Sequence, residues 1–315
     1  MTHKKPTLLF IPILGQKVGL GHLSRCLSLA SSSLNTQNVI LCGSDVCLDA
    51  FHFENVRLIK HINELSSCDL IISDQLDKNP HLLEKVKTHY GCPLVCLDLI
   101  SCTTKLPDLI INLVEHPPFN SANKEALLTG LEYAIINKRF LPVRVKKSAA
   151  KEISSILIMY GGSDPAALTP QALSFLNTLP EKYTVNIILG PLNKHRSAID
   201  CLTSNSHHKI SIYQSPKSLE DKMNANDVAF CGCGTTLFEL SYLGVPSIVS
   251  SQNELERSFI EKIAHYGITI NSPLSTAWKQ IKKQSVRQEI VEKQQTLFDG
   301  KGANRILTAC NLLLK

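Results

Sequence analysis

Three glycine-bearing loops carry the residues whose types and spacing are suited to chemistry. The first spans residues 15–22 and places His22 directly after Gly21, at the start of an expected helix. An imidazole titrates near neutral pH, so a histidine at this point can take a proton from water or from a hydroxyl group. The alternative is a histidine that only packs at a loop. The glycine spacing is G-x-x-x-G-x-G, which differs from the dinucleotide fingerprint.

The second loop, Gly161-Gly162-Ser163-Asp164-Pro165, lies between an expected strand and an expected helix. Ser163 or Asp164 can cap this helix, and Pro165 suits its first turn. Free backbone N–H groups at such a helix start can bind a phosphate. An ordinary connection between a strand and a helix is the alternative.

The third loop, Gly234-Thr235-Thr236, begins another expected helix and offers a second anion site. Glu239 lies one helical turn further on, where a carboxylate can accept hydrogen bonds from a ribose diol. A polar group follows the next expected strand, and we expect it to contact a ligand: Gln252, Asn253 and Glu254.

Composition limits the class of protein. The 315 residues suit two domains, and 43% hydrophobic with 19% charged residues excludes a disordered chain. The net charge of +6 suits a small anionic ligand, and without dense basic clusters we expect no nucleic-acid binding. The 11 cysteines lack zinc-site spacing, so we expect free thiols in a reducing compartment and no metal. No apolar run approaches the ~18 residues of a membrane span, so we expect a cytoplasmic protein.

Short apolar runs alternate with amphipathic segments along the chain. The runs are continuously hydrophobic, which is typical of parallel strands buried on both faces. Strands are expected at residues 8–14, 39–42, 56–59, 70–73, 94–97 and 109–111, then at 156–160, 185–189, 210–213, 228–231 and 247–250. Helices are expected at residues 22–34, 80–89, 166–179, 219–223, 237–243, 254–266 and 303–314.

This alternation predicts an α/β protein of two Rossmann-like domains, residues 1–144 and 145–315, separated at a polar segment near Pro142. The last helix can pack back on the first domain. Ligands of open α/β sheets bind beyond the carboxyl ends of the strands. We therefore expect the three loops to line a cleft between the two domains.

The ordered set of motifs resembles the GT-B superfamily of nucleotide-sugar enzymes. Within it, the chain looks like the nucleotide-sugar hydrolases of pseudaminic acid biosynthesis and their spore-coat-polysaccharide relatives. The matching segments span nearly the whole chain: Gly19-Leu20-Gly21-His22-Leu23-Ser24-Arg25-Cys26-Leu27, Gly130-Leu131-Glu132-Tyr133-Ala134 with Phe140, Gly161-Gly162-Ser163-Asp164-Pro165, Gly234-Thr235-Thr236 through Glu239, Gly244-Val245-Pro246-Ser247, Gln252-Asn253-Glu254, and Asp299-Gly300-Lys301-Gly302-Ala303-Asn304-Arg305-Ile306.

The resemblance implies a GT-B fold and an enzyme that releases UDP from a UDP-amino-sugar, UDP-2,4-diacetamido-2,4,6-trideoxy-β-L-altropyranose in the family. His22 would be the general base on a water that attacks the anomeric carbon with inversion. No metal or cofactor is implied, because helix N-termini supply positive potential for the leaving phosphate. The implied substrate-binding residues are Gly19, Gly21, Arg25, Asp74 and Tyr133 in the first domain, and Gly161, Gly162, Ser163, Asp164, Gly234, Thr235, Thr236, Glu239, Asn253 and Glu254 in the UDP-binding second domain.

Four positions differ from the family pattern, and two of them are Cys233 in place of an expected glycine and Asn137 in place of an expected arginine. The usual Asp-x-Tyr after the mid-domain strand is Asp74-Gln75-Leu76 here, and the usual paired Asp-Asp after the next strand is Asp98-Leu99. Two other functions therefore stay open. One is a glycosyltransferase in which the same histidine activates an acceptor hydroxyl, and the other is a nucleotide-sugar-binding protein without catalysis. The sequence indicates neither the sugar nor the oligomeric state.

Overall fold

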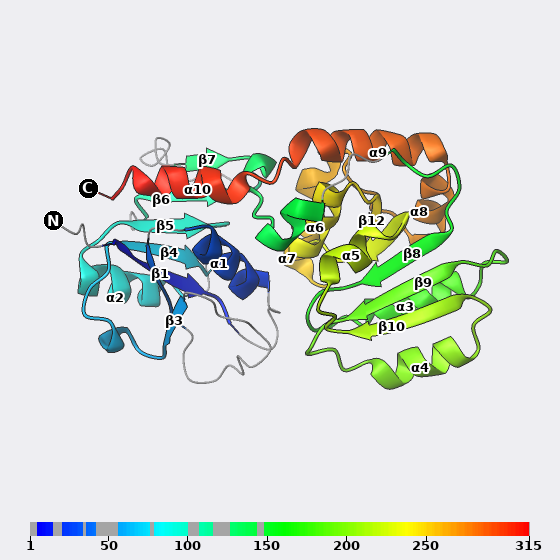
Figure 1. Cartoon of the computed structure of the whole chain (residues 1–315), viewed down its shortest axis with the longest axis horizontal. Helices are drawn as coiled ribbons and strands as arrows, with labels where there is room; N and C mark the ends of the chain where they lie inside the picture. Colours follow the sequence, from blue (N-terminus) through cyan, green and yellow to red (C-terminus); the bar gives the residue numbers. More distant parts are fainter. Residues whose placement is uncertain are drawn as a thin grey trace. The chain divides into compact units, whose positions relative to one another are not determined.

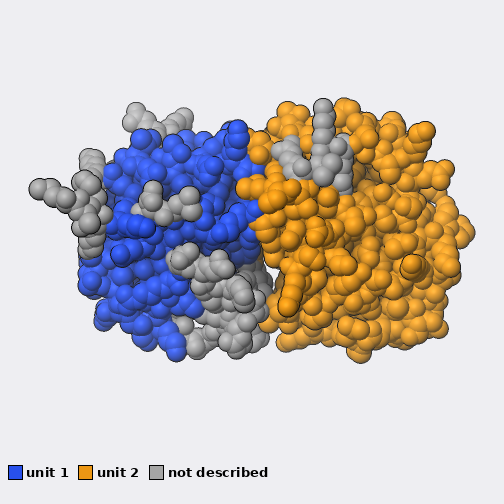
Figure 2. Space-filling view, viewed as in Figure 1, with its two compact units in different colours: residues 1–18, 22–138, 300–315 blue, residues 19–21, 139–299 orange. Residues whose placement is uncertain are grey.

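The computed structural model describes residues 5–14, 21–33, 36–41, 56–75, 79–99, 107–115, 127–143 and 148–314. The chain forms two compact units (Figures 1 and 2). The first comprises residues 1–18, 22–138 and 300–315, and the second comprises residues 139–299 together with residues 19–21. Gly19 of the first loop, Leu76 and the expected domain boundary at 144/145 lie outside the described residues, so that boundary stays a prediction.

The first unit is built on a seven-stranded parallel sheet (Figure 1). Strand β1 pairs with β2 on one side and with β4 on the other, so the chain order reverses beside β1. Ligands of open α/β sheets bind at such a switch point. In their order across the sheet, the strands are β3 (Val56–Ile59), β2 (Gln37–Leu41), β1 (Thr7–Pro12), β4 (Leu70–Asp74), β5 (Leu94–Leu97), β6 (Leu109–Asn112) and β7 (Leu127–Thr129).

Helices cover both faces of this sheet. Alternate residues of a strand point to opposite faces, and in β1 Leu8 and Phe10 join one hydrophobic cluster while Leu9 and Ile11 join another. The first cluster includes residues of α1 (Gly21–Ser32) and α10 (Gly302–Asn311), and the second includes residues of α2 (Pro80–Tyr90). The short turns η1 (Ile62–Glu64) and η3 (Leu131–Tyr133) also belong to this unit, whereas η4 (Lys138–Val143) lies in the second unit from Arg139 onward.

Helix α10 comes from the end of the chain and completes the core of the first unit. It contributes Ala303, Ile306 and Cys310 to the cluster that also contains α1. A Cβ atom at Gly302 would lie 2.1 Å from the carbonyl oxygen of Ala134, so only glycine permits this approach. Arg305 donates a hydrogen bond of 3.0 Å to the carbonyl oxygen of Glu132. Two of the sequence motifs are therefore explained by the packing of α10 against η3.

The second unit is built on a five-stranded parallel sheet. Strand β8 pairs with β9 and with β11, so the switch point lies between β8 and β11. A core that includes Trp278, Phe230 and Tyr183 packs against this sheet. In their order across the sheet, the strands are β10 (Lys209–Gln214), β9 (Thr184–Leu189), β8 (Ser155–Met159), β11 (Val228–Cys231) and β12 (Ser247–Val249).

Two groups of helices pack on the second sheet. In the first group, α3 contacts β8, α8 contacts β12, and the two helices contact each other. In the second group, α6 contacts β11 and β12 and also the helices α5 and α9. The helices are α3 (Leu168–Leu176), α4 (Arg196–Ser204), α5 (Leu219–Asn224), α6 (Thr235–Leu243), α7 (Glu254–Ile263) followed by η5 (Ala264–Tyr266), α8 (Leu274–Ile281) and α9 (Gln284–Leu297).

Arg287 in α9 is fully buried and bonds to backbone oxygens rather than to a carboxylate. Its guanidinium donates to the carbonyls of Ile281 and Lys282 at 2.7 and 2.8 Å, and to those of Ala150 and Lys151 at 2.6 and 3.0 Å. The side chain therefore satisfies the last carbonyls of α8 and fixes the segment that leads into β8.

The predicted fold class is confirmed, because both units are parallel α/β sheets with every expected strand in place. The interdomain cleft stays a prediction. Four elements were not predicted: β7, α4, α8 and α9. Strand β7 has three residues, too few for a pattern, and α9 buries the polar residues Arg287 and Gln294, which interrupt its hydrophobic period.

Substitution of Gly302 by alanine tests the docking of α10. Alanine favours a helix by about 1 kcal/mol over glycine, but here its methyl group overlaps the backbone at Ala134. We expect the steric overlap to outweigh the gain in helix propensity. The free energy of unfolding, measured by urea denaturation, should therefore fall by about 1–3 kcal/mol. Thr308→Ala, an exposed change on the same helix, is the control and should shift it by less than about 0.5 kcal/mol. An unchanged Gly302→Ala variant would contradict this packing.

Candidate functional site

Four polar side chains meet at the carboxyl edge of the first sheet, around its switch point. His22 and Arg25 lie in the first two turns of α1, Asp74 is the last residue of β4, and Asp98 follows β5 directly. Successive turns of α1 bring His22 and Arg25 to one side of the helix. Polar residues from the ends of two neighbouring strands and from one helix start therefore gather at a single edge of the sheet.

Asp74 is completely buried at the centre of this group. Its Oδ1 lies 2.7 Å from Nδ1 of His22 and 2.6 Å from a terminal nitrogen of Arg25, and its Oδ2 accepts from Nε of Arg25 at 2.9 Å. Burial alone would raise the pKa of the Asp74 carboxyl. The charges and hydrogen bonds of Arg25 and His22 outweigh that effect and lower its pKa to about 2. Asp74 is therefore an ionised carboxylate.

The ionised state of Asp74 determines the tautomer of His22. A carboxylate only accepts hydrogen bonds, so the hydrogen between the two groups belongs to Nδ1 of His22. Nε2 then carries a lone pair, and no described residue forms a hydrogen bond with it. The His22 side chain is 15% exposed, so a small molecule can reach it. This is the arrangement of a general base oriented by a carboxylate.

Arg25 is occupied by two protein carboxylates. Besides Asp74, it donates to Oδ2 of Asp98 through its other terminal nitrogen. Burial would lower the pKa of Arg25, but the two carboxylates outweigh burial and raise its pKa above the ordinary value. We expected Arg25 and Asp74 to touch the substrate. In the structure Asp74 is buried and Arg25 is bonded to two protein carboxylates, and their contact with a substrate stays a prediction.

The other two residues expected at this edge have local roles. Gly21 is the first described residue of α1, and a Cβ atom there would meet nothing within 4 Å. Tyr133 ends η3 and packs against the hydrophobic cluster that contains α1 and α10. Its contact is therefore with the core of the first unit.

In the second unit, the Asp164 carboxylate is bonded to the protein backbone, and its contact with a substrate stays a prediction. Asp164 is almost fully buried, and its carboxylate oxygens accept from the backbone N–H groups of Leu168 and Thr169 at 2.8 and 2.9 Å. Two of the N–H groups expected to bind phosphate are thus bonded to the protein's own carboxylate. The backbone is left-handed at Asp164 and at Ala167, so α3 begins at Leu168 rather than at residue 166.

The two glycines of the same loop lie in a positive-φ turn that packs closely against Gly190. Gly161 has φ +74°, a conformation that favours glycine. Gly162 lies against Gly190, where an added Cβ atom would be 2.4 Å from its Cα. Ser163 is partly exposed at the turn. The loop is consequently a tightly packed turn whose negative side chain already occupies the helix start.

The start of α6 is open by contrast. Gly234 is exposed, and a Cβ atom there would meet nothing within 4 Å. Among the described residues, no acceptor is bonded to the backbone N–H groups of Thr235 and Thr236. These N–H groups and the positive end of the helix dipole suit a phosphate. The third loop is therefore the candidate anion site of this unit.

Glu239 lies one turn further along α6 and is buried. Burial raises the pKa of its carboxyl. The positive charge of Arg139 lowers this pKa and the negative charge of Glu220 raises it, so that the resulting pKa is about 7. Near neutral pH the group is thus divided between its neutral and ionised forms. A perturbed carboxyl beside an open helix start is typical of a ligand site.

The polar group after β12 differs from expectation. The Oδ1 atom of Asn253 caps α7 by accepting from the backbone N–H of Glu256 at 2.9 Å. The Glu254 side chain is 76% exposed and pairs with Arg257 at 3.0 Å. Glu256, which the sequence analysis did not name, turns back toward the third loop and accepts from the backbone N–H of Gln252 at 2.9 Å. Asn253 and Glu254 therefore have structural or solvent-exposed roles here.

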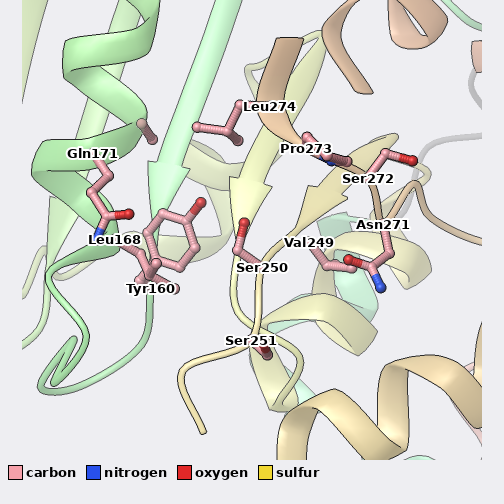
Figure 3. A pocket seen from close by; sticks show the side chains of 11 residues that line it. Tyr160, Leu168, Gln171, Val249, Ser250, Ser251, Asn271, Ser272, Pro273 and Leu274 are labelled. Atoms are coloured by element: carbon pink, nitrogen blue, oxygen red, sulfur yellow. The ribbon is translucent and has the colours of Figure 1, made fainter. Parts of the chain in front are cut away.

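A cavity of about 460 Å³ lies at the same edge of the second sheet (Figure 3). The described residues that line it include no charged side chain. The Tyr160 hydroxyl bonds with Ser250, and burial raises the pKa of this tyrosine. The polar side chains that line the cavity are Tyr160, Gln171, Ser250, Ser251, Asn271 and Ser272.

No helix in the ranges given above is long and apolar enough to cross a membrane. Within the same ranges, no three histidine, cysteine, aspartate or glutamate side chains are grouped as a metal site would require.

Replacement of Glu239 by glutamine tests the buried carboxyl. Its raised pKa means that the folded protein binds more protons than the unfolded chain between pH about 4.5 and 7, so stability falls as the pH rises through that window. We expect Glu239→Gln to exceed the wild type by about 2–3 kcal/mol in free energy of unfolding at pH 8, and to match it near pH 4.5. Glu292→Gln, an exposed change, should show no such dependence. Equal stability at pH 8 would contradict the assignment.

Comparison with known proteins gives distant relatives, and no family model matches the chain. It is 27% identical to the uncharacterized protein MJ1062 of Methanocaldococcus jannaschii over 282 residues, 79% of this chain and 57% of that protein. The chain thus spans little more than half of that relative. It is 24% identical to the spore coat polysaccharide biosynthesis protein SpsG of Bacillus subtilis over 321 residues, 93% of this chain and 94% of SpsG.

Solved structures share the fold at lower identity. MurG of Acinetobacter baumannii superimposes with a TM-score of 0.65 and 11% identity, covering 98% of this chain and 99% of MurG. HepE of Anabaena, solved with UDP and glucose, gives a TM-score of 0.60 and 11% identity, covering 98% and 99%. The chain therefore has a GT-B fold and is a relative of SpsG at low identity.

Proposed function

We propose that this protein hydrolyses a UDP-activated amino-sugar at its anomeric carbon, releasing UDP and the free sugar. The observation that carries the proposal is the hydrogen bond between Nδ1 of His22 and the buried carboxylate of Asp74. That bond leaves Nε2 as a base at a partly exposed position. The family pattern resembled by the sequence suggests the pathway, nonulosonic acid or surface polysaccharide biosynthesis.

In the proposed step, Nε2 of His22 removes a proton from water as the water oxygen attacks the anomeric carbon. The bond between that carbon and the phosphate oxygen breaks, and its electron pair leaves with UDP. The imidazolium formed on His22 is stabilised by the Asp74 carboxylate at 2.7 Å. The product sugar carries the inverted configuration.

The leaving group fits the start of α6. The free N–H groups of Thr235 and Thr236 would bind the diphosphate, and Glu239 would accept from the ribose hydroxyls. The cavity beside Tyr160 has only uncharged lining among the described residues, which suits an uncharged part of the ligand. A further part of the proposal is a cleft, across which the sheet edge that carries His22 faces the sheet edge that carries Thr235.

The relatives support a nucleotide-sugar substrate. SpsG is named for polysaccharide biosynthesis, and HepE was solved with UDP and glucose. Solved structures described as glycosyltransferases share the fold and favour a second candidate. In that function, His22 deprotonates an acceptor hydroxyl instead of water. Release of UDP from a UDP-amino-sugar without any acceptor supports hydrolysis, whereas release only with an acceptor supports transfer.

Substitution of His22 by alanine tests the base. We expect kcat/KM for UDP release to fall about 100- to 10,000-fold, because general base catalysis contributes that factor, while the Kd of UDP stays unchanged in calorimetry. The control is His207→Ala, which removes an exposed histidine of the second unit and should retain wild-type turnover. Full activity of His22→Ala would exclude His22 as the base. A wild-type protein that binds UDP and turns over no UDP-sugar would instead support a binding protein.

The Glu239→Gln variant provides a second test at the nucleotide. A charged hydrogen-bond acceptor for the ribose diol would be lost, so we expect the Kd of UDP to rise about 10-fold or more at pH 8. The same variant is expected to be the more stable protein at that pH. A variant with higher stability and unchanged UDP affinity would remove Glu239 from the ribose site.

A further inference from the structure

Asp98 is the one member of the His22 group that the sequence analysis did not include in the site. It lies where the related family is expected to carry a paired Asp-Asp, and here the next residue is Leu99. Its backbone has φ +48°, which is strained for a residue with a side chain. Its amide N–H donates to the carbonyl of Ile111 at 2.9 Å, and its Oδ1 accepts from the N–H of Leu113 at 3.1 Å. The backbone at the end of β6 therefore fixes this carboxylate.

The other oxygen of Asp98 accepts from a terminal nitrogen of Arg25. The other two nitrogens of that guanidinium donate to Asp74, at 2.9 and 2.6 Å. Charged hydrogen bonds thus run from the end of β6 through Asp98, Arg25 and Asp74 to Nδ1 of His22. We propose that Asp98 is a positioning residue, which acts through Arg25 to keep Nε2 of His22 free as the base. The inference rests on the proposed role of His22.

The first reason is geometric. The terminal nitrogen of Arg25 that bonds to Asp74 also lies 3.1 Å from Nδ1 of His22. If this N–H were donated to Nδ1 instead, Nδ1 would be the acceptor and the imidazole hydrogen would move to Nε2. Nε2 could then no longer accept a proton. Asp98 holds the opposite nitrogen of the guanidinium, which keeps the planar fork aligned on Asp74.

The second reason is charge. Asp74, Asp98 and ionised Arg25 together carry one net negative charge, and a proton on His22 brings the group to zero. Without the charge of Asp98, Arg25 and Asp74 would cancel, and a protonated His22 would be an uncompensated positive charge beside buried groups. Asp98 therefore favours the imidazolium that the proposed reaction forms on His22.

The test is Asp98→Asn, with Asp108→Asn as a matched control. Asparagine tolerates a left-handed backbone and retains one oxygen, so the turn after β5 is preserved. Asp108 also accepts from a backbone N–H, that of Leu94 at 2.7 Å, and from a cation, Lys87 at 2.8 Å. Asp108 lies at the amino end of the same sheet, so its substitution measures any general effect of losing a carboxylate on the fold.

Two readouts are measured in each variant. The ¹⁵N chemical shifts of the His22 ring, assigned by comparison with His22→Gln, report which ring nitrogen carries the hydrogen. Steady-state UDP release gives kcat and KM. In Asp98→Asn we expect the hydrogen to move in part to Nε2, and kcat to fall about 10- to 100-fold with KM unchanged. Asp108→Asn should keep the wild-type shifts and kcat.

An Asp98→Asn variant with the wild-type tautomer and wild-type kcat would overturn the proposal, as would equal effects in both variants. Should Asp98→Asn fail to fold, Arg25→Lys serves instead, because a lysine cannot bridge two carboxylates in a fixed fork and must shift the same ¹⁵N signals. If the wild type releases no UDP from any UDP-sugar, the proposed function fails. The tautomer shift then still decides whether Asp98 positions His22.

Discussion

The carboxylate of Asp74 is buried at the end of β4, and the character of the first site depends on its charge. An ionised group without water needs partners, and Asp74 has two, the guanidinium of Arg25 and the imidazole of His22. The first partner keeps the carboxylate ionised, and the ionised carboxylate then dictates where the hydrogen of the second lies. A structural requirement of the buried charge thus produces a base with a defined orientation.

Two helix starts that look alike in the sequence differ in what they offer a ligand. Before α3, Asp164 folds back and takes the N–H groups of Leu168 and Thr169. Before α6, Gly234 has no side chain to do so, and no acceptor among the described residues bonds to the N–H groups of Thr235 and Thr236. The distinction between a capped and an open helix start separates a folding element from a candidate anion site.

The sequence was sufficient to predict the strands, because residues buried on both faces of a parallel sheet form unbroken apolar runs. It also led to His22, because this histidine follows Gly21 at the start of an expected helix. It could not predict the left-handed backbone at Asp164 and Ala167, which moves the start of α3 to Leu168, although it offered Asp164 as a cap. Nor could it join Arg25 to Asp98, 73 positions away, because the register of the strands decides that contact. The packing role of Gly302 was likewise hidden, because Ala134, which it contacts, lies far away along the chain.

The helix α10 has a consequence for the order of events during synthesis. It supplies Ala303, Ile306 and Cys310 to a core whose strands lie in the first 129 residues. A ribosome therefore releases every strand of the amino-terminal sheet, and then the entire second sheet, before the chain holds the helix that closes the earlier core. Domains usually mature in the order of translation. Here the earlier unit must wait with an incompletely covered hydrophobic face, and the later unit has the opportunity to mature first.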